Sequence, residues 1–209
     1  PEQKEAYTRT RALIRALSSG ERPELKRPLQ RDMRQETELY FEYIIREDRS
    51  LSELLDSDYT FLNDRLATHY AIEGVKGSKF RKVSLAPGSP RGGILTQGTI
   101  LAYTSNPTRT SPVKRGVFIL ENILGTPPAA PPPNIPALED VAHGKDIEAM
   151  SLRETLALHR EDALCRSCHN RMDPLGLALE NFNAMGIWRD AELNQAIETD
   201  GVLITGESF

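Results

Sequence analysis

The sequence is poor in several residue types that would point to common protein classes. Its 209 residues include two cysteines, too few for a disulfide framework or for a zinc site built from two cysteine pairs. No apolar run is long enough to cross a bilayer, which excludes a predicted membrane span. The formal net charge is -4, and no basic stripe with interleaved aromatics argues for nucleic-acid binding. What remains, 39% hydrophobic and 27% charged residues, is typical of a globular protein.

Both cysteines fall in one short motif, Cys165-Arg166-Ser167-Cys168-His169. The pattern C-x-x-C-H is the attachment signature of c-type haem. Two thiols would form thioethers with the haem, and His169 would be the proximal iron ligand. One helical turn separates the two cysteines, so both sulfurs can reach one edge of the porphyrin.

Other interpretations of the motif stay open. A redox-active C-x-x-C pair would be expected after a βαβ unit, and none precedes it. A structural zinc site would need four ligands, and outside the motif the sequence offers only His69, His143 and His159 as imidazoles. A chance match of five residues is the remaining alternative.

The compartment follows from the haem interpretation. Covalent haem attachment takes place outside the bacterial cytoplasm, so we expect a periplasmic, extracellular or cell-surface protein. The opening residues Pro1 to Glu5 are polar and lack the apolar core of a signal peptide. Because the sequence starts with Pro, we expect an export signal to have been removed, or the chain to be part of a longer polypeptide.

The periodicity predicts a mainly α fold with a small β-hairpin. Turn chemistry at 87–93 would join the two strands of the hairpin, and Met172 to Gly176 is predicted as a turn. The expected helices cover 2–19, 30–46, 50–55, 59–70, 113–124 and 151–161, with a short one around 179–182, and the expected strands cover 80–85 and 94–101. Ser151 and Glu154 have capping-box spacing.

A proline-rich stretch suggests the domain organisation. Residues 127–136 contain six prolines and predict an extended, stiff spacer. We therefore expect a helical region with the hairpin at 1–126 and a proline-rich linker at 127–150. The haem-attachment segment and the start of a truncated C-terminal domain would occupy 151–209.

Several long segments resemble a family of large exported bacterial proteins, abundant in planctomycete-type and myxobacterial genomes. The matching segments are Arg91–Gln97, Thr104–Gly116, Leu124–Pro128, Cys165–Arg189, Asp58–Asn63 and Leu66–Tyr70. Members of that family carry consecutive domains of unknown function followed by a haem-attachment segment. The resemblance implies a c-type cytochrome module within a longer polypeptide, but no established reaction.

The ligand on the other side of the haem decides between electron transfer and catalysis. His69 ends a predicted helix in a family-like segment and is the leading distal candidate. Met185 is the next candidate, and open coordination is the third. We expect Arg109, Arg115, Trp188 and Arg189 to bind the two propionates, with ordinary surface ion pairs as the alternative for each Arg.

The sequence therefore predicts helices packed around one covalent haem c. The expected function is electron transfer outside the cytoplasm, with a redox partner protein or other haem domains of the same or an associated chain. Neither nucleic acid nor a membrane span is expected. The alternatives are a peroxidase-like or other haem enzyme with an open distal site, and a structural module of a larger exported protein.

Overall fold

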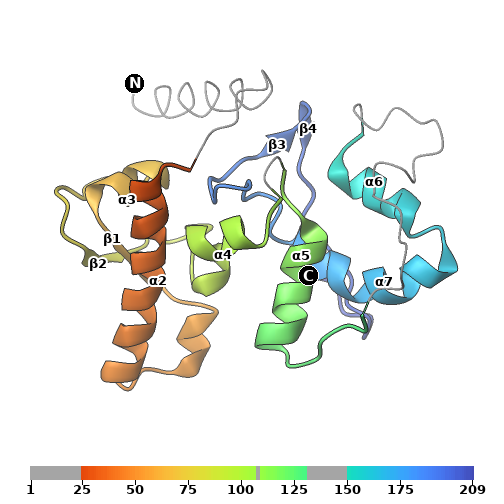
Figure 1. Ribbon diagram of the computed structural model, residues 1–209, viewed down its shortest axis with the longest axis horizontal. Helices are drawn as coiled ribbons and strands as arrows, with labels where there is room; N and C mark the ends of the chain where they lie inside the picture. Colours follow the sequence, from red (N-terminus) through yellow and green to blue (C-terminus); the bar gives the residue numbers. More distant parts are fainter. Residues whose placement is uncertain (1–24, 107–108, 131–149) are drawn as a thin grey trace. The chain divides into compact units, whose positions relative to one another are not determined.

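The computed structural model describes residues 25–106, 109–130 and 150–209 (Figure 1). They form a mainly helical fold with short antiparallel strands, which confirms the predicted fold class at this level. The predicted helix at 2–19 and most of the proline-rich linker lie outside the described residues. The chain divides into two compact units. Unit 1 comprises the residues up to Ile100 together with Met185–Ile187, and unit 2 comprises Leu101–Ala184 and Trp188–Phe209.

The longest helix, α2, spans Arg27–Arg46 and belongs to unit 1. Its buried residues include Met33, Glu36, Tyr40 and Ile44, which recur every three or four positions and therefore share one face. The helix predicted from residue 30 is confirmed. It begins three residues earlier because proline is tolerated in the first turn of a helix.

The β-hairpin has a different first strand from the one expected. Strand β2, Arg81–Ser84, pairs antiparallel with β1, Tyr59–Leu62, with Tyr59 opposite Ser84. The prediction of a helix over 59–70 was therefore wrong in its first half. Helix α3, Asp64–His69, begins only after Asn63, whose side chain accepts a hydrogen bond from the Leu66 backbone N–H.

The prediction of a second hairpin strand at 94–101 was also wrong. It forms a 3₁₀ turn, η2 at Ile94–Thr96, followed by α4 at Gly98–Tyr103. Its apolar residues Ile94 and Leu101 are both buried, although the backbone is helical and not extended. The short helix expected near residue 50 is present as η1, Leu51–Leu54, with Ser50 as its cap.

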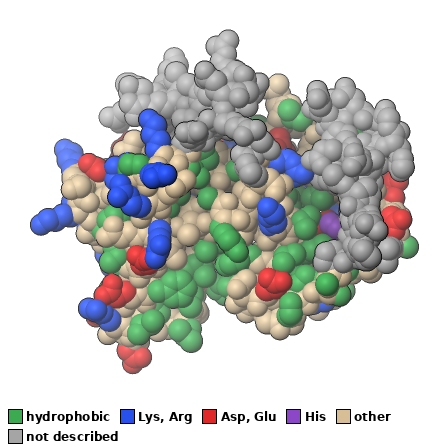
Figure 2. Space-filling model, in the orientation of Figure 1, with side chains coloured by type: hydrophobic (Ala, Val, Ile, Leu, Met, Phe, Trp, Pro, Cys, Tyr) green, Lys and Arg blue, Asp and Glu red, His purple; other side chains and the backbone are tan. Residues whose placement is uncertain are grey.

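The core of unit 1 lies between α2, α3 and β1. Met33, Leu62, Leu66, Ala67 and Tyr70 form its hydrophobic cluster. Part of this unit remains apolar at its surface. Figure 2 shows hydrophobic side chains gathered at the C-terminal end of α2 and around η1, where the exposed large ones are Phe41, Ile45, Leu51 and Leu55. Of the helices described here, none combines the length and apolar character that a membrane span needs.

Unit 2 is built around two helices that approach each other closely. Helix α5, Pro112–Phe118, continues into a π-helical turn, η3, at Ile119–Ile123, and confirms the helix predicted at 113–124. It packs against α7, Ala163–Leu177. A Cβ atom on Gly116 would lie 1.9 Å from the Met172 carbonyl oxygen, and one on Gly176 would lie 1.8 Å from that of Pro112. The contact therefore needs glycine on both helices.

Unit 2 also contains a second capped helix, a proline inside α7 and a short pair of strands. Helix α6, Leu152–His159, begins with the predicted capping box of Ser151 and Glu154. The turn predicted at 172–176 was wrong, because α7 continues through Pro174. Asp173 at 0% exposure and Met172 at 7% are buried there, so packing holds a helical backbone that proline alone disfavours. A two-residue turn joins β3, Ala191–Glu192, to β4, Gln195–Ala196.

Candidate functional site

The three motif side chains lie on the first half of α7. Cys165, Cys168 and His169 occupy positions i, i+3 and i+4, which place them on one side of the helix. Both cysteines are free thiols and partly exposed. The Asp162 side chain accepts a hydrogen bond from the Cys165 backbone N–H at 3.4 Å, and its carbonyl oxygen accepts one from Arg166, so Asp162 caps the start of the helix.

The environment of Cys165 favours the neutral form of its thiol. Partial burial, together with the negative charge of Asp162, raises the pKa of the Cys165 thiol. Reactive C-x-x-C pairs instead lower the pKa of their nucleophilic thiol with nearby positive charge or a helix N-terminus. A neutral, accessible thiol is compatible with thioether formation by external attachment machinery.

His169 is held by a buried carboxylate. Its Nδ1 atom lies 2.9 Å from Oδ1 of Asp173, one helical turn later. The side chain of Asp173 is 0% exposed, and its second oxygen, Oδ2, lies 3.4 Å from Nη1 of Arg160. A carboxylate only accepts hydrogen bonds, so Nδ1 of His169 carries the proton and Nε2 keeps its lone pair.

A second imidazole packs against this group. The ring of His159, at the C-terminus of α6, lies 4.7 Å from that of His169 between centroids, at 72°. His159 is 7% exposed, and its Nδ1 atom is buried with no hydrogen-bond partner among the described residues. Burial and the neighbouring His169 lower the pKa of His159. A neutral His159 therefore lies beside the motif in the folded chain.

These donors fit a covalently bound haem. The two thiols would supply the thioether positions, and His169 would bind the iron through Nε2. The hydrogen bond from the other ring nitrogen to a carboxylate is the usual second partner of a metal-binding histidine. Over the described ranges, no group of three or more His, Cys, Asp or Glu residues is gathered to hold a bare metal ion.

Both distal-ligand candidates lie in unit 1. His69 is the last residue of α3, and its Nε2 atom is 2.8 Å from the Met185 carbonyl oxygen. Burial lowers the pKa of His69, so its imidazole is neutral at pH 7 and suitable as an iron ligand. Coordination through Nε2 would require exchange of the hydrogen bond to Met185. The distal role of His69 stays a prediction.

The residues expected to bind propionates take part in a buried network in unit 2. Nη1 of Arg115 lies 3.0 Å from Oε1 of Glu180 and also donates to the Leu179 carbonyl oxygen. Nη2 of Arg189 lies 2.9 Å from the other oxygen of Glu180. Burial lowers the pKa of Arg115 to about 10 and raises that of Glu180. Arg115 and Arg189 thus share one carboxylate, which gives both a clear structural role.

Trp188 and Arg109 are also engaged. Nε1 of Trp188 donates to Asp190 at 2.8 Å, and Nη1 of Arg109 lies 3.4 Å from the Thr110 carbonyl oxygen. Haem contacts by these four residues stay predictions. Sequence reasoning missed Asp173 and Arg160. The His169-x-x-x-Asp173 spacing was the available signal, but the expected turn at 172–176 concealed it.

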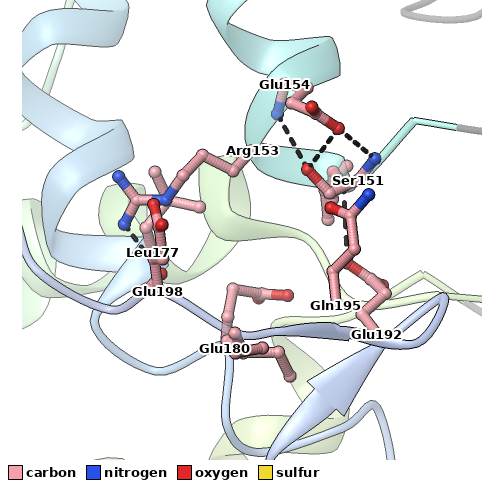
Figure 3. Close-up of a pocket in the computed structure, with 11 residues that line it drawn as sticks. Ser151, Arg153, Glu154, Leu177, Glu180, Glu192, Gln195 and Glu198 are labelled. Carbon is pink, nitrogen blue, oxygen red and sulfur yellow. Dashed lines mark hydrogen bonds between the residues drawn. The ribbon is translucent and has the colours of Figure 1, made fainter.

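A polar pocket of about 140 Å³ lies elsewhere in unit 2 (Figure 3). Ser151, Arg153, Glu154, Glu180 and Glu192 are among its lining residues, and the residues of the C-x-x-C-H motif do not line it. Its polar groups already serve the fold: Glu154 closes the capping box, and Arg153 donates to the carbonyl oxygens of Glu198 and Asp200. The pocket is also smaller than a usual cofactor site of about 300 Å³ or more.

Two families of domains of unknown function match parts of the chain. Residues 5–72 match the family described as "Protein of unknown function (DUF1592)". Residues 91–192, which include the whole C-x-x-C-H motif and α7, match the family described as "Protein of unknown function (DUF1588)". The two matches follow each other along the chain, which supports the expected succession of domains of unknown function. Neither the curated proteins nor the solved structures gave a match.

Proposed function

We propose that the chain is a c-type cytochrome module that transfers electrons through one covalently bound haem c. The observation that carries this proposal is the arrangement on α7. Cys165, Cys168 and His169 lie on one side of the helix, and the buried carboxylate of Asp173 orients the imidazole at 2.9 Å. A chance C-x-x-C-H sequence has no reason to include such a partner for the histidine.

The roles of the residues follow from their positions. Cys165 and Cys168 would anchor the haem edge as thioethers, and His169 would bind the iron through Nε2. A haem in this setting supplies reversible one-electron exchange. The chain's own contribution is to fix the imidazole, through Asp173 and Arg160, so that little reorganises when an electron arrives or leaves.

The proposal extends to location and partners. Covalent haem attachment implies an exported protein, periplasmic or at the cell surface. Its partner would be a redox protein or another haem domain of the same or an associated chain. The exposed apolar side chains of unit 1 and the partly exposed motif are both compatible with such an encounter.

The decisive test is expression of the chain with haem-attachment machinery in the periplasm of a host bacterium. The protein should gain the mass of one haem, keep its colour in acidified acetone and stain for haem after denaturing electrophoresis. Cys165→Ala/Cys168→Ala should abolish all three signals, whereas Asn170→Ala, an exposed change on the same helix, should preserve them. Wild-type protein that loses its colour to the solvent would contradict the proposal.

A haem enzyme with an open distal position is a second candidate, favoured by one observation. The hydrogen bond from His169 to Asp173 raises the basicity of the imidazole, and a more basic ligand stabilises oxidised iron. A high-spin ferric spectrum together with turnover of hydrogen peroxide would favour the enzyme. A low-spin spectrum without peroxide turnover would favour electron transfer.

A further inference from the structure

Asp173 is a buried carboxylate whose shorter contact is with the proposed haem ligand His169. Its side chain is 0% exposed and contacts two partners, the imidazole of His169 and the guanidinium of Arg160. Resting on the proposed function, we propose that Asp173 is a positioning residue that fixes the tautomer of His169 and holds the reduction potential of the haem low.

The tautomer follows from hydrogen-bond chemistry. An ionised carboxylate has no proton to donate, so the proton of the contact belongs to Nδ1 of His169. Nε2 is then the nitrogen with the free lone pair. Because His169 and Asp173 are one turn apart on the same helix, the hydrogen bond also restricts rotation of the ring about its side-chain torsions. The axial ligand is therefore oriented before the haem is attached.

The position of Arg160 determines how strongly each oxygen of Asp173 interacts with its partner. Arg160 approaches Oδ2 at 3.4 Å, whereas His169 approaches Oδ1 at 2.9 Å. The side chain of Arg160 is 22% exposed, so solvent weakens its attraction to the carboxylate. The stronger contact is the one to His169. Arg160 makes the burial of a carboxylate tolerable without neutralising the oxygen that faces the imidazole.

The effect on the iron follows from this charge. In a buried site a carboxylate polarises the N–H bond strongly, which gives the imidazole partial imidazolate character. Such a ligand stabilises ferric over ferrous iron. Loss of the charge should therefore shift the equilibrium toward ferrous iron and raise the potential.

The first experiment measures the reduction potential of the holoprotein by optical titration. Asp173→Asn keeps the shape and a hydrogen-bond acceptor but removes the charge. We expect the ferric/ferrous equilibrium to shift at least tenfold toward ferrous iron, which corresponds to about 59 mV for one electron. Asp162→Asn is the control, since it also removes one negative charge beside the motif, where the carboxylate accepts a hydrogen bond from the Cys165 backbone N–H. Its shift should be clearly smaller.

A spectroscopic readout separates orientation from a general charge effect. In ¹⁵N-histidine-labelled holoprotein, the Nδ1–H proton of His169 should be detectable and slow to exchange with solvent. Asp173→Asn should shift this resonance and accelerate its exchange, whereas Asp162→Asn should leave it in place. A residue with a merely structural role would not produce this difference.

A second pair of variants tests the proposal if Asp173→Asn does not fold. Arg160→Gln leaves Asp173 more available to His169 and should lower the potential. Arg166→Gln removes a cation that donates to the carbonyl oxygens of Arg160 and Glu161, and should lower the potential less. The proposal is overturned if each variant shifts the potential no more than its control.

Haem content is measured for every protein, because it separates failure of the proposed cytochrome function from failure of the proposed role of Asp173. Wild type without covalent haem would overturn the proposed function and this inference together. Wild type with covalent haem, but with a potential insensitive to Asp173 and Arg160, would overturn the positioning role of Asp173 and leave the cytochrome assignment standing.

Discussion

Nε2 of His69 lies 2.8 Å from the carbonyl oxygen of Met185, 116 positions further along the chain. The two sequence-derived candidates for the distal ligand are thus neighbours within unit 1. Arg91, stacked 3.7 Å above the ring of Tyr70, also donates to the carbonyl oxygen of Gly186. The side chains of His69 and Arg91 therefore hold residues 185–187 in unit 1.

Substitution of His69 tests the distal assignment. If His69 binds the iron, wild-type ferric protein should be low-spin, and His69→Ala should convert it to high spin and allow carbon monoxide to bind the ferrous form. Met185→Leu is the control, because it removes the sulfur but keeps the backbone carbonyl. Optical spectra of the three proteins decide the matter: a spin change in Met185→Leu alone would identify the sulfur as the ligand, and a high-spin wild type would indicate an open site.

Glu36 should make the stability of unit 1 depend on pH. Its carboxyl group accepts hydrogen bonds from Thr60 and Tyr70, both at 2.6 Å, but complete burial raises its pKa from 4.5 to about 7. A raised pKa in the folded state means that its contribution to stability is full below about pH 4.5 and is lost as the pH rises through 7. A shift of this size corresponds to about 3 kcal/mol.

Urea unfolding of wild type and Glu36→Gln at pH 5 and pH 8 measures this effect. Thr60 and Tyr70 donate to different oxygens of Glu36, so the oxygen of glutamine can accept one of these hydrogen bonds while its NH2 group places a donor at the other position. Glutamine does not ionise. We expect the variant to lose the part of the pH dependence between these values that belongs to Glu36, and to be the more stable protein at pH 8. Equal pH dependence in the two proteins would contradict the assignment.

Removal of Glu180 should destabilise unit 2 strongly. The carboxylate binds Arg115 and Arg189 and also accepts a hydrogen bond from Thr110 at 2.6 Å. Glu180→Ala would leave the fully buried Arg115 without its counter-charge, which costs about 3–5 kcal/mol for a buried pair. Chemical unfolding measures the loss. In the control, Glu38→Ala removes an exposed partner of Arg34 and should cost about 0.5 kcal/mol or less.

The close approach of α5 and α7 should make Gly116 intolerant of any side chain. A Cβ atom would lie 1.9 Å from the Met172 carbonyl oxygen, so Gly116→Ala must push the helices apart. We expect a loss of about 3 kcal/mol or more in the free energy of unfolding, the upper end for overpacking. Glu121→Ala, an exposed change in the adjacent π-helical turn, should have little effect. A stable Gly116→Ala protein would show that the two helices do not pack this closely.

Sequence reasoning succeeded where the signal is local. The helix ending at Arg46 follows from apolar residues at helical spacing, and the helix beginning at Leu152 follows from the capping box of Ser151 and Glu154. The C-x-x-C-H motif is also complete within five residues, so haem attachment could be proposed from it without a fold, and haem attachment stays a prediction. In each case the residues that cause the structure are less than a few helical turns apart.

Tertiary structure decided everything that depends on distant partners. Tyr59–Leu62 became a strand because Arg81–Ser84 pairs with it, a choice that the local preferences of either segment leave open. The helix around Pro174 persists because packing against α5 outweighs the local cost of proline. Asp173 is buried against His169 in the same helix, so the local motif supplied the proposed haem ligands, and only the folded chain supplied the carboxylate that orients one of them.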